Sequence, residues 1–152
     1  MSSGSDRDAT MRALPEIATR FEQLYQSLWT QPHIPASTLE LCRLRLAQLH
    51  RCDVEWQRRD HAVPAPKRDA LQHWPDDEQF SAAERACLAF TEVYAMDTQS
   101  ITDQLADAVK AHHGDAGLVM LVEALGILDG MTRLSLLWQL PVPSAMRSPI
   151  GD

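Results

Sequence analysis

Three cysteines, Cys42, Cys52 and Cys87, are the candidate nucleophiles of this 152-residue chain. An odd number of thiols cannot all pair within one chain, so we expect at least one free thiol and a reducing compartment, the cytoplasm. Cys42 and Cys87 fall on apolar faces of predicted helices, which places them in the core. A turn at residues 50–53 would put the Cys52 thiol at the start of a new helix, where the dipole favours the thiolate. Cys52 is therefore the candidate reactive or sensing thiol, and the alternative is a small buried apolar residue.

Charged residues that follow Cys52 offer acid–base and anion-binding chemistry. Glu55 would oppose a thiolate at Cys52 by like-charge repulsion. Arg59 carries a guanidinium fork that suits bidentate contact with a carboxylate or an enolate. Alternatively, Glu55 pairs with Arg51 and Arg59 at four-residue spacing, as an exposed ladder worth about 0.3–0.5 kcal/mol per pair. The histidines show no metal-ligand spacing, so the sequence predicts no metal site and no cofactor.

Apolar spacing and capping patterns predict an all-α chain of about six helices that position these residues. An apolar stripe at three- and four-residue spacing predicts the first helix over residues 14–29. Two Ser-x-x-Glu capping boxes then predict helix starts at Ser37, with Glu40, and at Ser81, with Glu84. The connection over residues 63–80 is rich in proline and is predicted to hold one helical turn at residues 68–73.

Two more helices are predicted in the last third of the chain. Ser100 and Asp103 are expected to cap a helix that Gly114 ends, and a long helix then runs from residue 115 to about residue 140. The long helix is apolar nearly all round, which a small chain buries most easily by self-association, so we expect a homo-oligomer. Asp129 and Arg133, four residues apart, are interpreted as an ion pair at the subunit interface.

Length and composition predict one folded domain over residues 12–143, with a disordered lead at 1–11 and a tail at 144–152. Hydrophobic residues make up 45% and charged residues 23% of the chain, which is close to the globular average. The formal net charge of −7 argues against nucleic acid or an anionic membrane as a partner. The sequence also lacks a signal peptide and an apolar run that could span a membrane, which again favours the cytoplasm.

Three segments carry a family resemblance: residues 39–52 (LELCRLRLAQLHRC), 80–92 (FSAAERACLAFTE) and 129–134 (DGMTRL). Their order, with a Glu twelve residues before a Cys, a Ser-x-x-Glu-Arg-Ala helix start and an Arg near the end of a long apolar helix, resembles the carboxymuconolactone decarboxylase / alkylhydroperoxidase D-like (AhpD-like) family. The resemblance covers roughly residues 15–143. It implies an AhpD-like fold with a helical-hairpin core and a long buried C-terminal helix, assembled as trimers or hexamers. For the redox-active members it implies a peroxidase that reduces hydroperoxides through a Cys-x-x-Cys pair.

The redox motif of that family, Cys-x-x-Cys-x-x-x-His with an upstream Glu, is only partly present. By the resemblance, Glu40 matches the proton-relay glutamate and Cys52 the first cysteine, whereas Glu55 replaces the second cysteine. Arg59 stands at the relay histidine, and His61 lies two residues later, turned about 200° away on a helix. The dithiol is therefore lost, because Cys52 has no resolving thiol with which to close a disulfide.

Three hypotheses follow for function. The first is a thiol-dependent peroxidase in which Cys52 alone is oxidised, Glu40 accepts the proton and an external thiol regenerates the site. The second is a cofactor-free lyase or isomerase on a small carboxylate, with Arg59 as the binding group and Glu55 or His61 moving protons. The third is a non-enzymatic oligomeric scaffold. Both enzyme hypotheses require the turn at 50–53, because one straight helix would separate Glu40 from Cys52 by about 18 Å.

Overall fold

The computed structural model describes residues 6–138, and these residues form helices and no strands. The elements in chain order are α1 (Asp6–Met11), α2 (Pro15–Leu28), α3 (Ala36–Leu49), α4 (Asp53–Gln57), α5 (Ala65–Ala70), the 3-10 helix η1 (Leu71–Asp76), α6 (Ala82–Met96), the 3-10 helix η2 (Thr98–Ser100) and α7 (Asp103–Trp138). The predicted all-α class is confirmed. Residues 1–11 were predicted to be disordered, but they contain α1. The predicted tail, residues 144–152, lies outside the described residues.

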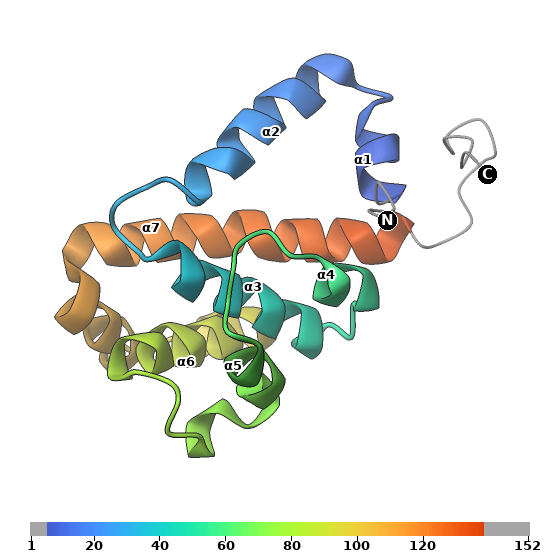
Figure 1. Ribbon diagram of the computed structural model, residues 1–152. Coiled ribbons are helices and arrows are strands. Elements are labelled where there is room, and N and C mark those ends of the chain that lie inside the picture. The colour runs from blue at the N-terminus through green and yellow to red at the C-terminus, as the bar shows by residue number, and fades with distance from the viewer. Residues whose placement is uncertain (1–5, 139–152) are drawn as a thin grey trace.

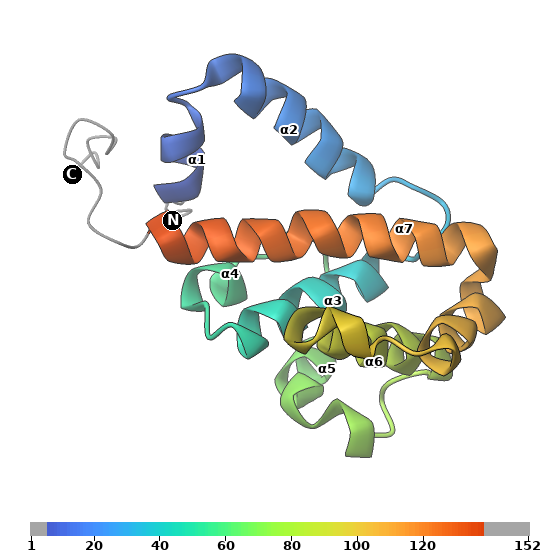
Figure 2. The same cartoon turned by 180° about the vertical axis from the view of Figure 1, so that it is seen from behind.

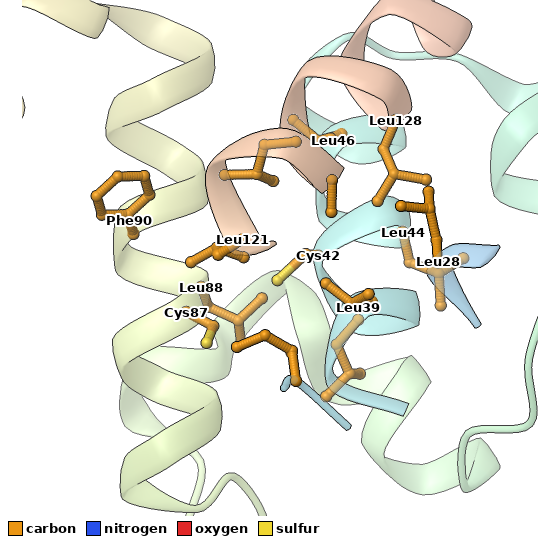
Figure 3. Packing of buried hydrophobic residues seen from close by; sticks show 14 of the residues in the cluster. Leu28, Leu39, Cys42, Leu44, Leu46, Cys87, Leu88, Phe90, Leu121 and Leu128 are labelled. Atoms are coloured by element: carbon orange, nitrogen blue, oxygen red, sulfur yellow. The ribbon is translucent and has the colours of Figure 1, made fainter. Parts of the chain in front are cut away.

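Helix α3 is the centre of the core, with α6 and α7 packed against it (Figure 1). Four of its leucines point to different sides and are almost fully buried, which requires neighbours on every face; they are Leu39, Leu41, Leu44 and Leu46. The thiols of Cys42 and Cys87 lie among these leucines between α3 and α6 (Figure 3). Burial raises the pKa of Cys42 to about 12 and also raises that of Cys87. Both cysteines are therefore core residues, as predicted.

Helix α6 begins at the predicted capping box. The Glu84 backbone N–H donates to Ser81 Oγ at 3.1 Å, and the Ser81 N–H donates back to Glu84 Oε2 at 2.9 Å. The Glu84 carboxylate also binds Lys67 Nζ at 3.0 Å, which fastens α5 to the start of α6. The proline-rich connection is more helical than predicted, because α5 and η1 together fill residues 65–76.

Helix α7 bends sharply at Gly114, which has a φ of 70° that favours glycine. The first segment lies beside α6, and the second crosses over α3 (Figures 1 and 2). The predicted break at Gly114 is thus confirmed. The prediction that Ser100 caps this helix was wrong. Thr102 Oγ1 accepts the Leu105 N–H at 3.3 Å, and the Ser100 hydroxyl binds Asp97 instead.

Helices α1 and α2 form an arch over the second segment of α7 (Figure 2). The predicted helix over residues 14–29 is confirmed, with Pro15 in its first turn. Tyr25 and Leu28, in its last turn, are its buried residues, and a cavity of about 400 Å³ lies between α2 and α7. Among residues 6–138, none of the helices combines the length and apolarity needed to cross a membrane.

Candidate functional site

The predicted turn at residues 50–53 separates α3 from α4 and places Cys52 directly before α4. Arg51 adopts the left-handed conformation, with a φ of 53°, which reverses the chain after α3. The Cys52 N–H then donates to the Ala47 carbonyl oxygen at 2.8 Å, which holds the turn closed. Cys52 therefore stands at the N-terminal end of α4.

The Cys52 thiol is only 1% exposed. Burial raises its pKa, the backbone N–H of Glu55 partly lowers it, and the negative charges of Glu55 and Asp53 raise it further. The expectation of a stabilised thiolate at this helix start was wrong, because α4 has only five residues and two of them are acidic. At neutral pH the group is mainly a thiol.

A cavity of about 540 Å³ opens at the α3–α4 junction. Its lining includes Cys52, so this residue borders a space that a small molecule could occupy, whereas Cys42 and Cys87 lie in the core. The lining residues are Arg45, Ala47, Gln48, Arg51, Cys52, Asp53, Trp56 and Gln72.

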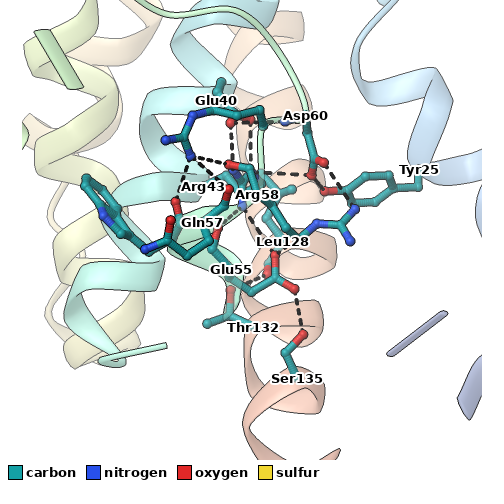
Figure 4. Close-up of polar contacts among 12 residues, drawn as sticks. Tyr25, Glu40, Arg43, Glu55, Gln57, Arg58, Asp60, Leu128, Thr132 and Ser135 are labelled. Atoms are coloured by element: carbon teal, nitrogen blue, oxygen red, sulfur yellow. Dashed lines mark hydrogen bonds and ion pairs between the residues drawn. The ribbon is translucent and has the colours of Figure 1, made fainter. Parts of the chain in front are cut away.

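A buried cluster of charges lies beside this junction, centred on Arg43 (Figure 4). Its Nη2 and Nε bind the two carboxylate oxygens of Glu40 at 2.6 and 2.9 Å. Its Nη1 donates to the Glu55 backbone oxygen at 2.7 Å and lies 3.3 Å from Glu55 Oε2. The side chains of all three residues are at most 1% exposed. Burial by itself would lower the pKa of Arg43, but the hydrogen bond and charge of Glu40 raise it overall, so the guanidinium stays charged.

The cluster continues into three other parts of the fold: α7, the segment that follows α4, and α2 (Figure 4). Ser135 of α7 donates to Glu55 Oε1 at 2.6 Å. Arg58 Nη2 binds Asp60 Oδ1 at 3.1 Å, and the Tyr25 hydroxyl of α2 donates to Asp60 Oδ2. Each buried carboxylate is thus paired with an arginine of the cluster. The cluster connects α2, α3, α4 and α7.

Two interpretations of the acidic residues were wrong. Glu40 does not cap α3, because that helix begins at Ala36 after Pro35 and no side chain caps it. Glu55 is not part of an exposed ladder with Arg51 and Arg59, because its carboxylate is buried against Arg43 and Ser135.

Arg59 and His61 lie outside the cavity at Cys52. The exposed Arg59 Nη1 donates to the carbonyl oxygens of Trp56, Gln57 and Arg58, so it closes the C-terminal end of α4. The His61 ring is stacked on Trp29 with 6.3 Å between ring centroids. The structure therefore brings Glu40 and Glu55 together in one cluster and places Cys52, Arg59 and His61 around it.

Sequence reasoning missed a second cluster of polar side chains, which joins the end of α3 to α7. His50 Nε2, at the end of α3, lies 2.6 Å from Asp129 Oδ1 of α7, and Arg133 Nε binds Asp129 Oδ2 at 2.8 Å. The expected pair of Asp129 and Arg133 is present. Its histidine partner is 79 positions away, so no local spacing could reveal it. Arg43 and Arg58 were missed as well, although the three-residue spacing of Glu40 and Arg43 on one helix was a usable signal.

Comparison with known proteins gives fold likeness only. No family model and no curated protein sequence matches the chain. A solved structure of a protein of unknown function from Agrobacterium tumefaciens, ATU0492, described as a candidate antioxidant defence protein AhpD, has a TM-score of 0.73 at 17% identity over 88% of this chain and 94% of its own. A cysteine-to-alanine variant of the debrominase Bmp8, in complex with 2,3,4-tribromopyrrole, has a TM-score of 0.72 at 16% identity over 91% and 78%. The chain therefore has the AhpD-like helical fold.

Proposed function

We propose that the protein is a thiol-dependent peroxidase that uses the single cysteine Cys52. The main observation in its favour is that Cys52 borders a cavity at the α3–α4 junction, whereas Cys42 and Cys87 lie in the core. The AhpD-like fold, shared with a candidate antioxidant defence protein, supports this chemistry.

The reaction needs one external co-reactant, a low-molecular-weight thiol. The Cys52 thiolate attacks a peroxide oxygen, the O–O bond breaks, and an alcohol leaves after taking up a proton, so the cysteine becomes a sulfenic acid. One external thiol then forms a mixed disulfide with Cys52 and releases water. A second external thiol releases Cys52 and leaves as a disulfide. No second protein cysteine is required.

Glu40 serves this site as a positioning residue rather than as the expected proton acceptor. Both of its carboxylate oxygens bind Arg43, and Arg43 in turn binds the backbone oxygens of Glu55 and Arg58 at 2.7 and 3.0 Å. These two carbonyls lie within and just after α4, so the Glu40–Arg43 pair fixes α4 and the cysteine that precedes it.

Peroxide consumption in the presence of dithiothreitol tests the proposal. We expect consumption by the wild-type protein and its loss in Cys52→Ser, with Cys87→Ala as the matched control that removes a core thiol. Equal rates for wild type and Cys52→Ser would contradict the mechanism. The debrominase variant with a similar fold is in complex with 2,3,4-tribromopyrrole, so that compound is a second one to assay.

A second candidate function is a lyase or isomerase that acts on a small carboxylate at Arg59. It is favoured by a cavity of about 310 Å³ whose lining includes Tyr25, Trp29, Arg58 and Arg59. This activity would survive thiol alkylation and disappear in Arg59→Ala. Loss of both activities in a folded oligomer would favour the scaffold hypothesis.

We also propose that the protein assembles as a homo-oligomer, a trimer or a hexamer. Apolar side chains in the first part of α2 and directly before it are unburied, since Leu14, Ile17 and Leu24 are exposed by 63%, 54% and 49%. The second segment of α7 likewise exposes Val119 and Leu137. Light scattering after size exclusion should report three or six chains, and Ile17→Glu should reduce that number.

A further inference from the structure

The cavity at Cys52 combines an aromatic wall with polar and cationic groups. Trp56 is the aromatic residue of the lining, and the Arg68 guanidinium lies over its ring, 4.3 Å from the centroid. Gln48 and Gln72 contribute amide groups to the lining. This mixture suits a flat organic molecule that carries a polar substituent.

The charges on the cavity lining balance one another, and one further cation lies beside the lining. Arg45 is neutralised, because its guanidinium binds Glu92 Oε1 at 2.8 Å. Asp53 contributes one negative charge, and Arg51 contributes one positive charge. Arg68, behind Trp56, adds a second positive charge. The lining and Arg68 together therefore carry one net positive charge, on a chain whose formal net charge is −7.

Arg51 supplies the cation that remains available to a ligand. Among residues 6–138 its side chain makes no hydrogen bond or ion pair, and it is exposed on the cavity lining. The other cations of the lining and its surroundings already have partners, since Arg45 binds Glu92 and Arg68 binds the Trp56 backbone oxygen at 2.7 Å. A free guanidinium beside an aromatic wall recognises a carboxylate attached to an apolar body.

We propose that the cavity at Cys52 selects carboxylated organic substrates, with Arg51 contacting the carboxylate and Trp56 the apolar body. The proposal rests on the proposed function, because it names the substrate class of the same thiol. The oxidant is then a carboxylated organic hydroperoxide, which leaves as the corresponding hydroxy acid once its O–O bond has broken at the Cys52 sulfur.

Two aromatic disulfides of different charge test this selectivity without any peroxide. The Cys52 thiolate attacks one sulfur of the reagent, forms a mixed disulfide and releases an absorbing thiol or thione. The probes are 5,5′-dithiobis(2-nitrobenzoate), which carries two carboxylates, and the neutral 4,4′-dithiodipyridine. The measured quantity is the ratio of their second-order rate constants with the native protein, and Cys52→Ser gives the background to subtract.

We expect Arg51→Asn to lower this ratio about three- to tenfold, as loss of one partly screened charge contact would. Asn suits the test because it tolerates the left-handed backbone at this position. Arg51→Lys should keep most of the ratio. Arg20→Ala, on the exposed surface of α2, makes the same change in net charge and should leave the ratio unaltered. In 1 M salt the wild-type ratio should approach that of Arg51→Asn, because the Debye length is then about 3 Å.

An unchanged ratio in Arg51→Asn would overturn the selectivity, and so would an equal fall in Arg20→Ala, which would reflect net charge alone. A fall as large in Arg51→Lys as in Arg51→Asn would also overturn it, because the charge would then not be the determinant. These outcomes are separate from those of the peroxide assay. A selective thiol that consumes no peroxide would refute the peroxidase and leave the anion preference standing.

Discussion

Replacing Arg43 by Met should destabilise the protein by about 4–6 kcal/mol. Methionine matches the length and helix propensity of arginine, so the main change is the loss of the buried guanidinium. Glu40 loses two hydrogen bonds, of 2.6 and 2.9 Å, in a position where its side chain has no exposed area. An uncompensated buried charge costs about 3–5 kcal/mol, and two backbone carbonyls that lose their donor add about 1 kcal/mol.

Urea unfolding followed by circular dichroism measures this change. With an m value of about 2 kcal/mol/M, the unfolding midpoint should fall by about 2–3 M. Arg133→Met is the matched control, since that guanidinium is 57% exposed and its pair with Asp129 should contribute about 1 kcal/mol or less. Adding Glu40→Gln to Arg43→Met removes the stranded charge and should restore at least about 1 kcal/mol. The reasoning fails if the two arginine variants cost the same, or if the double variant is no more stable than Arg43→Met.

Three further outcomes are expected. Because burial raises the pKa of Cys52 above its ordinary value near 9, the thiolate fraction and the rate of thiol modification should keep rising through pH 9, and a plateau below pH 8 would contradict this. Gly114→Ala should lower stability by about 1–2 kcal/mol in thermal unfolding through backbone strain alone, since no atom lies within 4 Å of the added Cβ. Ser81→Ala should cost about 1 kcal/mol and Ser37→Ala close to nothing, because only Ser81 caps a helix.

The two Ser-x-x-Glu patterns show why local sequence predicts some helix starts and misses others. At Ser81 and Glu84 the side chain of each residue accepts the backbone N–H of the other, so the capping box forms as the pattern predicts. At Ser37 the same spacing fails, because Glu40 lies inside the fold and its carboxylate binds Arg43 instead. Propensity and spacing describe neighbours in the chain, and a buried cation outweighs them.

The all-α class, the turn at 50–53 and the break at Gly114 follow from local signals and could be predicted. The contents of the site could not. The hydrogen bond between Glu55 and Ser135 spans 80 positions, and the pair of His50 and Asp129 spans 79. Such contacts depend on how helices pack, which no spacing within one helix encodes.

The Arg43 cluster also constrains how this sequence can change over generations. Substitution of any single charged residue of the cluster leaves its partners buried without a counter-charge. Each such substitution by itself is therefore strongly unfavourable. Replacing the whole set with apolar residues of similar volume would cost little. Glu40, Arg43 and Glu55 should therefore be inherited as a unit and lost as a unit, and among descendants of this chain they should covary as one block.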